Sequence, residues 1–326
     1  MKAILHIGSG KTGSKSVQGF LRHNADYLKD KNYAQMFSTK VGNYDIGLGA
    51  YSGVGAWRKT CINKWGWDLP EDFDALFECK FREEFERLDA QCVIFSFEGL
   101  INLPIEKVKK IKVLLENFFD DFYIFAFARR QDRHAVSSYT TRLRNAGVSD
   151  RNILYSNTGD PRGIDYYEKF LNWSGCFGED NVKFVDYELC EDVVECFTDH
   201  LNLPEGLRVP SDRANQSLSA FGQEVLRMFN EKLAEEPEYR EVADKVRAVL
   251  KDYYIGEPLK PSRQDAEEMF RMYEQSNKAL SEAMGSPRRN FFDEDFSEYP
   301  EIFSPRQLDF GRLKHYIDVA LNESQR

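Results

Sequence analysis

The segment from residue 4 to residue 21, ILHIGSGKTGSKSVQGFL, constrains the fold of this chain more than any other stretch. Its apolar start, Ile4 to Ile7, predicts a buried strand, and the small residues around Lys11 predict a loop. A helix is expected to begin near Ser14 to Ser16, because apolar residues then recur on one helical face (Val17, Phe20, Leu21, Leu28). A strand, a loop of small residues and a helix start in this order are suited to holding an anion.

Three features of this loop favour an anion site. The helix N-terminus presents unpaired N–H groups and carries a partial positive charge. Gly8, Gly10 and Gly13 let the backbone come close to a ligand, and Lys11 adds a full positive charge. The segment therefore predicts a cradle for phosphate or sulfate. The alternative is a glycine-rich turn that only joins a strand to a helix.

The loop differs from the ATP-binding motif G-x-x-x-x-G-K-[ST]. If Lys11 and Thr12 are the last two residues of that motif, its first glycine falls on Leu5. If Lys15 and Ser16 take those places, a serine stands where the glycine before the lysine should be. Because a shift of one residue misplaces the lysine, the sequence argues against ordinary ATP binding.

Length and charge narrow the class of protein and of partner. A chain of 326 residues can bury a full core, and a net charge of −10 argues against general binding to nucleic acid or to a membrane surface. A strand begins by Ile4 and no apolar run approaches the ~20 residues of a membrane span, so we expect neither a secretory signal nor a span. The six cysteines lack zinc spacing, and Cys92 and Cys176 lie among apolar residues as buried thiols do. We therefore expect a cytoplasmic protein.

Further strands and helices alternate along the chain. Strands are predicted where β-branched and aromatic residues cluster, at 92–97, 122–128 and 182–187. Helices are predicted between them and after them, at 104–119, 165–173 and 193–201. This alternation predicts an α/β fold with a central parallel sheet flanked by helices.

Two regions depart from the alternating pattern. Residues 30–91 are too long for a plain crossover and predict an insertion with a helix at 73–88. The chain after about Phe221 is expected to be mostly helical, with one helix at 265–284. The tail at 288–303 is aromatic and acidic, and we expect it to wrap the surface.

Polar residues follow three of the predicted strands. In an open parallel sheet, ligands bind beyond the carboxyl ends of the strands. The Lys11 loop follows the first strand, Glu98 follows the second, and Arg129 and Arg130 follow the third. Two cations and one carboxylate are therefore expected to face a common crevice. The alternative for the arginines is a surface ion pair with Asp132 or Asp120.

The loop also carries a family resemblance. The sequence resembles the sulfotransferases that use 3′-phosphoadenosine-5′-phosphosulfate (PAPS), and it is most similar to the bacterial branch. In that family, a strand leads into a loop K-[TS]-G-[TS]-[TS]-[TS] that binds the 5′-phosphosulfate. The matching residues here are Lys11, Thr12, Gly13, Ser14, Lys15 and Ser16. The family usually has a hydroxyl residue where this chain has Lys15, which would either add a second cation or point outward.

A second family element binds the 3′-phosphate through an arginine at a strand end and a serine eight positions later. Arg129 and Ser137 match this element, and Arg130 with Ser138 is an alternative register. The first register places Tyr139 where the family has an aromatic residue. The resemblance implies a fold like that of P-loop NTPases in a single domain, with a core at about 1–220 and a helical extension and tail at about 221–326.

The resemblance also implies an activity. It is the in-line transfer of a sulfuryl group from PAPS to an acceptor hydroxyl or amine, without a metal. Of these acceptors we expect a hydroxyl on a carbohydrate or small metabolite. Lys11 would stabilise the departing oxygen, and the N–H groups of residues 12–16 with the Ser16 hydroxyl would hold the other oxygens. Glu98 would be the general base, and His134 is the other candidate for this role. Alternatively, the Glu98 carboxylate only caps the N–H groups of the loop. Arg213 could also reach the 3′-phosphate.

The acceptor and two rival functions stay open at this level. Aromatic residues of the insertion could form an acceptor wall or belong to the core: Tyr51, Trp57, Trp65 and Trp67. One rival is a small-molecule kinase, because residues 93–98, VIFSFE, resemble a strand that ends in a magnesium-binding acid. The other rival is a catalytically silent nucleotide-binding protein of the same fold. The sequence predicts no oligomeric state.

Overall fold

The computed structural model describes residues 1–36, 46–65, 72–145, 148–154, 164–208, 218–235 and 256–305. The chain divides into two compact units. Unit 1 comprises Met1–Arg129, Gly163–Ala214 and Gln275–Phe292, and unit 2 comprises Arg130–Arg162, Asn215–Glu274 and Asp293–Arg326. Trp67, Arg213 and the side chain of Trp65, which the sequence analysis singled out, lie outside the described residues.

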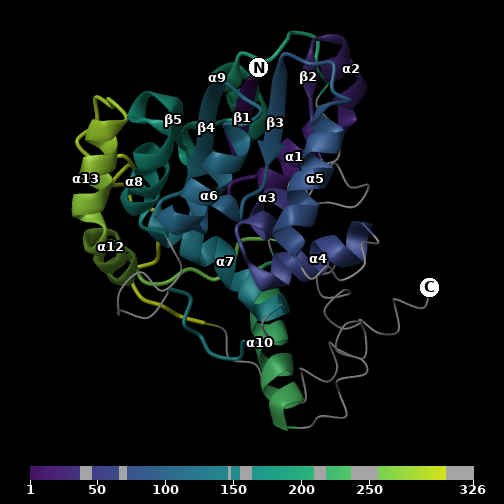
Figure 1. The fold of residues 1–326 in the computed structure, drawn as a ribbon. Helices are drawn as coiled ribbons and strands as arrows, with labels where there is room; N and C mark the ends of the chain where they lie inside the picture. Colours follow the sequence, from purple (N-terminus) through teal and green to yellow (C-terminus); the bar gives the residue numbers. More distant parts are fainter. Residues whose placement is uncertain are drawn as a thin grey trace. The chain divides into compact units, whose positions relative to one another are not determined.

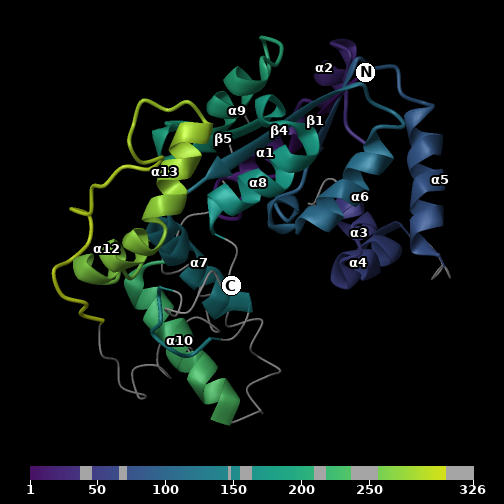
Figure 2. The same cartoon turned by 60° about the vertical axis from the view of Figure 1, so that its left-hand side comes forward.

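Unit 1 is built on one five-stranded sheet (Figures 1 and 2). Its strands lie in the order β2-β3-β1-β4-β5, and every neighbouring pair is parallel. The strands are β1 (Lys2–His6), β2 (Tyr33–Ala34), β3 (Cys92–Ser96), β4 (Asp121–Ala128) and β5 (Val182–Asp186). The predicted α/β fold with a central parallel sheet is therefore confirmed. The sequence analysis missed β2, because a strand of two residues has too little alternation to recognise.

The strand order reverses beside β1. This strand lies between β3 and β4, with His6 opposite Ser96 on one side and Phe125 on the other. The chain first places β2 and β3 on one side of β1 and then returns to add β4 and β5 on the other. In open α/β sheets, ligands bind at such a reversal, beyond the carboxyl ends of the strands. The topology therefore directs attention to the loop after β1 and the residues after β3 and β4.

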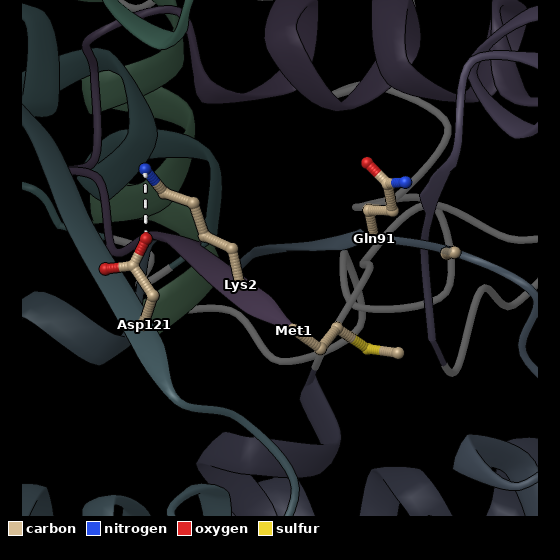
Figure 3. A pocket seen from close by; sticks show the side chains of 5 residues that line it. Met1, Lys2, Gln91 and Asp121 are labelled. Atoms are coloured by element: carbon tan, nitrogen blue, oxygen red, sulfur yellow. Dashed lines mark ion pairs between the residues drawn. The ribbon is translucent and has the colours of Figure 1, made fainter.

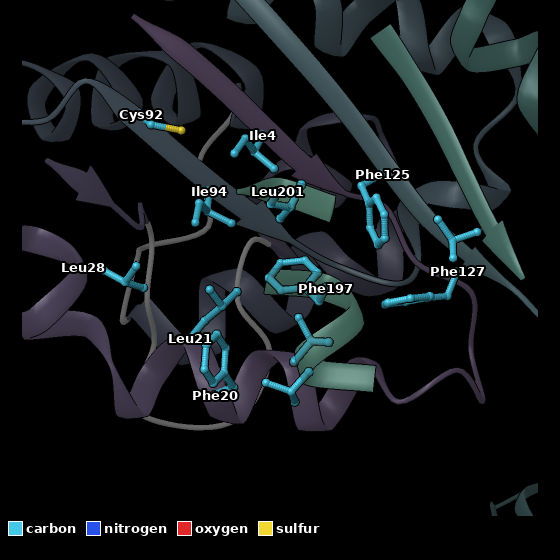
Figure 4. Packing of buried hydrophobic residues seen from close by; sticks show 13 residues of the cluster. Ile4, Phe20, Leu21, Leu28, Cys92, Ile94, Phe125, Phe127, Phe197 and Leu201 are labelled. Carbon is cyan, nitrogen blue, oxygen red and sulfur yellow. The ribbon is translucent and has the colours of Figure 1, made fainter. Parts of the chain in front are cut away.

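One face of the sheet is covered by α1 (Ser14–His23) and α9 (Val193–Leu201). Apolar side chains from both helices point at the strands, as Figure 4 shows for Phe20 and Leu21 of α1 and Phe197 of α9. They pack on Ile4 and Phe125 of the sheet, and all of these residues are buried. The helical spacing of the apolar residues in α1 is thus explained by burial against β1.

The opposite face is covered by α5 (Phe73–Phe85), α6 (Ile105–Leu115) and α8 (Tyr166–Phe177). The ring of Phe81 in α5 stacks on Phe95 of β3, with ring centroids 6.2 Å apart. The ring of Phe170 in α8 meets Phe184 of β5 edge to face at 6.2 Å. The sheet of unit 1 is therefore buried on both faces, as expected for parallel strands. The remaining helices of this part are α2 (Ala25–Asp30), α3 (Ile46–Tyr51), α4 (Gly55–Trp65) and α13 (Glu274–Ala283), of which α13 begins with the last residue of one unit 2 segment.

Aspartate side chains fix the starts of three helices. Asp72, Asp165 and Asp192 each precede a helix and accept hydrogen bonds from backbone N–H groups of its first turn. Such caps satisfy donors that have no partner within the helix, and each typically stabilises a helix by about 1 kcal/mol. They explain why α5, α8 and α9 begin where they do.

Unit 2 is helical in its described part. Its helices are α7 (Gln131–Asn145), α10 (Ala220–Glu235) and α12 (Arg263–Met272), and α7 contacts both of the others (Figure 2). Tyr139, Val225 and Ala266 belong to their shared apolar cluster. The predicted single helix at 265–284 is wrong, because the N–H of Tyr273 bonds to the carbonyl of Phe270 and closes α12 with a tight turn.

The tail at 288–303 is more deeply buried than the sequence analysis expected. Phe291 and Phe292 are buried within unit 1, and Tyr299 is buried within the apolar cluster of unit 2. The phenol of Tyr299 donates a 2.6 Å hydrogen bond to Asp132 in the same unit. The aromatic residues of the tail are therefore core residues and do not simply cover the surface.

The cysteines divide into two groups. Cys92 and Cys176 are free and buried, as predicted, and burial raises the pKa of the Cys92 thiol to about 11. Cys190 and Cys196 form a disulfide, which the sequence analysis did not predict. Within the described ranges, no helix combines the length and the apolar composition that crossing a membrane requires.

His6 is a core residue at the end of β1. It is fully buried, and its Nδ1 lies 2.8 Å from the hydroxyl oxygen of Ser96. Burial disfavours the charged imidazolium and lowers the pKa of His6 to about 3. The imidazole is therefore neutral near pH 7 and is not suited to take up a proton from a substrate.

Candidate functional site

One carbonyl oxygen joins the two ends of the loop after β1, residues 8–13, by accepting two side-chain hydrogen bonds. The Ser9 carbonyl accepts a hydrogen bond from the Thr12 hydroxyl at 2.6 Å and another from the Ser14 hydroxyl at 3.1 Å. Lys11 adopts a left-handed backbone conformation with φ 68°, and Gly13 does so with φ 72°. Such a conformation costs roughly 1–2 kcal/mol for a residue with a side chain, so the surrounding contacts must hold Lys11 in place. Thr12 and Ser14 thus use their hydroxyls to shape the loop.

Helix α1 begins at the end of this loop. The Gly13 carbonyl accepts from the N–H groups of Ser16 and Val17, which are the first bonds of the helix. The N–H groups of Gly13, Ser14 and Lys15 precede those bonds and have no partner within the helix. They form the donor set that an anion would meet, together with the partial positive charge of the helix terminus. Of the predicted loop residues, Lys11 and Ser16 are half-buried, Thr12 is buried and Lys15 is exposed.

Helix α9 supports the loop from behind. A Cβ atom built on Gly13 would lie 2.8 Å from Cγ1 of Val193, the first residue of α9. Both the positive φ and this close approach require glycine at position 13. The sequence analysis found Gly13 from its motif, but nothing in the sequence indicated Val193 as its neighbour.

Glu98 lies against the same loop. It lies two residues beyond the end of β3, and a Cβ atom built on Gly8 would lie 3.2 Å from its Cα atom. Burial raises the pKa of the Glu98 carboxyl group above its usual range, while the charge of Lys15, the polar Ser14 hydroxyl and the charge of Lys11 act in the opposite direction. Glu98 therefore combines a desolvated carboxylate with two neighbouring cations. Such a balance can keep a carboxylate ionised and basic.

A tryptophan from the insertion fixes the turn that carries Glu98. The indole of Trp57 in α4 packs edge to face on Phe97, with ring centroids 4.9 Å apart. It also fills the space beside two glycines, since a Cβ atom built on Gly99 would lie 2.6 Å from Trp57 Cζ2 and one on Gly49 would lie 2.6 Å from Cε3. Trp57 therefore packs against Phe97 and Gly99, the residues immediately before and after Glu98.

Tyr51 has the same packing character. It is buried, its ring stacks on Phe77 at 5.2 Å, and its hydroxyl donates a 2.6 Å hydrogen bond to Glu78. Of the two alternatives for the aromatic residues of the insertion, the core alternative therefore holds for Tyr51, whereas Trp57 is half-buried.

Arg129 joins the end of β4 to the Lys11 loop. Its Nη1 donates to the Lys11 carbonyl at 3.3 Å, and its Nε donates to Glu188 at 2.8 Å. Its backbone N–H donates to the Tyr166 hydroxyl at 3.3 Å, and this hydroxyl also lies 3.4 Å from the Ser9 hydroxyl. The structure thus brings Lys11, Glu98 and Arg129 to one edge of the sheet, and the partner of Arg129 is Glu188 instead of either aspartate considered above.

Arg130 has a different environment, within unit 2. It is fully buried, and its guanidinium donates to both carboxylate oxygens of Asp132 at 2.8 Å. It also donates to the Asp293 carboxylate at 2.7 Å and to the Asp295 carbonyl at 2.8 Å, and it lies over the ring of Phe296. These contacts already neutralise the guanidinium of Arg130 and occupy its N–H groups. In the alternative register, Arg130 with Ser138, the same N–H groups would have to bind the 3′-phosphate.

The other predicted residues of this element lie on α7 in unit 2. Ser137 and Ser138 are both half-buried. His134 is only 9% exposed, so the alternative of an exposed helix residue is wrong. Arg129 is the last residue of its segment of unit 1, and its pairing with Ser137 stays a prediction.

A hollow also opens at the amino ends of the strands (Figure 3). It is lined by Met1, Lys2, Ala90, Gln91 and Asp121, and the Lys2 ammonium lies 3.7 Å from the Asp121 carboxylate. This edge is opposite to the one that carries the Lys11 loop. Because ligands of open parallel sheets bind at the carboxyl ends, we take the Lys11 edge as the candidate site.

Because Gly13 lies against α9, adding one methyl group at this position should strongly destabilise the fold. We expect Gly13→Ala to lower the free energy of unfolding by about 2–4 kcal/mol, because it adds backbone strain and a clash with Val193. Gly10→Ala is the matched control, since a Cβ atom at Gly10 meets nothing within 4 Å. Urea unfolding monitored by circular dichroism measures both variants. Equal losses for the two would contradict the role given to α9.

Comparison with known proteins adds little to this geometry. No protein-family model matches the sequence, and no curated protein matches it. Among solved structures, it is matched by the crystal structure of a sulfotransferase from Alicyclobacillus acidocaldarius, with 12% sequence identity and a TM-score of 0.40. The match covers 87% of this chain and 96% of that chain. A likeness of this extent carries no argument about activity, which must rest on the site itself.

Proposed function

We propose that this protein is a sulfotransferase that moves a sulfuryl group from PAPS to an acceptor hydroxyl by in-line transfer. The proposal rests on one observation above all, the hydrogen bond from Arg129 to the Lys11 carbonyl. This contact couples a cation at the end of β4 to an oxyanion cradle at the end of β1, so that two anionic groups of one nucleotide can be bound together. The motif resemblance then identifies those groups as the 5′-phosphosulfate and the 3′-phosphate.

The Lys11 loop has the donors that the phosphosulfate requires. The N–H groups of Gly13, Ser14 and Lys15 would hold its non-reacting oxygens, together with the Ser16 hydroxyl. The Lys11 ammonium would stabilise the negative charge that develops on the departing phosphate oxygen. Thr12 contributes through its backbone, because its hydroxyl is bonded to Ser9.

Glu98 is the proposed general base. As the bond from sulfur to the acceptor oxygen forms, the acceptor proton passes to the Glu98 carboxylate. The bond from sulfur to the bridging phosphate oxygen breaks, and 3′-phosphoadenosine 5′-phosphate (PAP) leaves. His134 remains the rival base, whereas the position of Glu98 beside Lys11 and Lys15 supports the carboxylate.

For the 3′-phosphate we propose Arg129 with Ser137. The full set of acceptors around Arg130 argues against Arg130 with Ser138, since an anion there would have to displace Asp132 or Asp293. The acceptor is proposed to be a hydroxyl of a carbohydrate or small metabolite. A cytoplasmic location stays an expectation from the sequence.

The first prediction tests the nucleotide and Lys11 together. In a thermal-shift screen with PAPS, PAP, ATP and GTP, we expect PAPS and PAP to raise the melting temperature in the absence of Mg²⁺. We expect Lys11→Ala to reduce turnover by about 100- to 1,000-fold, the usual effect of removing one donor from the developing charge. Lys109→Ala, which removes an exposed lysine of α6 that is paired with Glu106, is the matched control.

Each rival function predicts a different result in that screen. A kinase would require Mg²⁺ and prefer ATP. A catalytically silent protein would bind PAP tightly and transfer sulfate to no hydroxyl in a broad acceptor panel. Full activity of Lys11→Ala would contradict the mechanism.

The second prediction concerns pH. Glu98 must be deprotonated to act, and its raised pKa moves the loss of activity on acidification to a higher pH than an ordinary glutamate would give. Because Lys15 lowers that pKa, Lys15→Ala should move the acidic limb of kcat/KM to still higher pH. Glu98→Gln should reduce turnover by about 100- to 10,000-fold and abolish this limb. A limb that persists in Glu98→Gln would show that another group, such as His134, is the base.

The third prediction distinguishes the two registers on α7. We expect Ser137→Ala to weaken PAP binding by about 10- to 150-fold, the loss of one hydrogen bond to a charged group, and Ser138→Ala to leave it unchanged. Both serines are half-buried on the same helix, so each variant controls for the other. Isothermal titration calorimetry measures the affinities, and the reverse order would favour Arg130 with Ser138.

A further inference from the structure

We infer that Glu188 is a positioning residue, which holds the guanidinium of Arg129 in the orientation that meets the 3′-phosphate. The inference rests on the proposed function for the identity of that anion. The orientation itself rests on contacts within unit 1, which can be tested without any nucleotide.

Two edges of the Arg129 guanidinium are already held. Its Nε donates to Oε1 of Glu188 at 2.8 Å, and its Nη1 donates to the Lys11 carbonyl at 3.3 Å. The side chains of Arg129 and Glu188 are only 22% and 24% exposed, so this ion pair is better shielded from water than a surface pair. Two bonds from different nitrogens prevent rotation of the planar group. Among the described residues, the N–H groups of Nη2 donate to no acceptor, so they can meet an incoming anion.

The face of the guanidinium is held as well. Its central carbon lies 5.1 Å from the centroid of the Tyr187 ring. Tyr187 and Glu188 are neighbours in one short 3₁₀ turn, η3 (Tyr187–Leu189), which follows β5. One turn therefore supplies both an edge contact and a face contact to Arg129.

The turn is itself anchored. The Asp186 carboxylate accepts from the Glu188 N–H at 3.1 Å and from Arg288 Nη2 at 3.1 Å. Asp186 is buried at the end of β5, so Glu188 extends from a fixed point of the sheet. Arg129 is thus ordered before any ligand arrives, and binding need not restrict its rotamers.

Glu188 has two opposite effects on an anion. Ordering Arg129 in advance favours binding by about two- to tenfold, the usual entropic cost of immobilising one long side chain. The negative charge of Glu188 opposes the anion. Glu188→Gln removes the charge and keeps an oxygen that can accept from Nε, whereas Glu188→Ala removes both. The two variants carry the same charge, so their difference isolates the positioning effect.

Calorimetric titration of wild-type protein and the two variants tests the inference. We expect Glu188→Ala to bind PAP about two- to tenfold more weakly than Glu188→Gln. Adenosine 5′-phosphosulfate lacks the 3′-phosphate and should bind equally to both variants. Glu191→Ala removes an exposed carboxylate nearby and should match the wild type for both nucleotides. Equal PAP affinities of Glu188→Ala and Glu188→Gln would overturn the inference.

A ligand-free measurement separates this inference from the proposed function. In a ¹H–¹⁵N spectrum of arginine side chains, the Nε–H resonance of Arg129 is identified by its loss in Arg129→Lys. It should move to the position of a water-exposed arginine in Glu188→Ala and remain displaced in Glu188→Gln. No response to Glu188→Ala would overturn the positioning role. If the resonance responds but the wild type binds neither nucleotide, the positioning role stands and the proposed function fails.

Discussion

The candidate site depends on a single acceptor, the carbonyl oxygen of Ser9. By accepting the hydroxyls of Thr12 and Ser14, it bends the chain after β1 so that Lys11 and Gly13 take left-handed conformations. The bend ends at the N-terminus of α1, where the N–H groups of Gly13, Ser14 and Lys15 have no partner within the helix. These are the donors that an anion at this edge would meet.

Much of this architecture can be predicted from the sequence. The ends of β1, β3 and β4 are recognisable because each apolar run stops at a polar residue or at glycine. Parallel strands place their carboxyl ends at one edge of the sheet. The sequence therefore predicts that Lys11, Glu98 and Arg129 lie at the same edge. The prediction succeeded there because it used topology, which requires only the order of the elements.

The supporting residues could not be predicted in the same way. Glu188 lies 59 positions from Arg129 in the sequence, and Tyr166 lies 37 positions from it. Neither carries a pattern that distinguishes it from other polar residues on short turns and helices. Likewise, the break at Tyr273 depends on a local hydrogen bond within a stretch whose apolar spacing fits one continuous helix. Side-chain contacts across long separations are set by packing, which periodicity does not encode.

Gly49 and Gly99 leave room for the indole of Trp57, so the packing of the insertion is linked to the position of Glu98. The indole abuts the backbone on the carboxyl side of Glu98, so a change in α3 or α4 that moves Trp57 would also disturb the turn at Phe97–Gly99. Under the proposed function, the packing of the insertion and the reactivity of Glu98 therefore cannot drift independently in this chain. A descendant with an altered insertion would need compensating change around the Phe97–Gly99 turn to keep its general base in place.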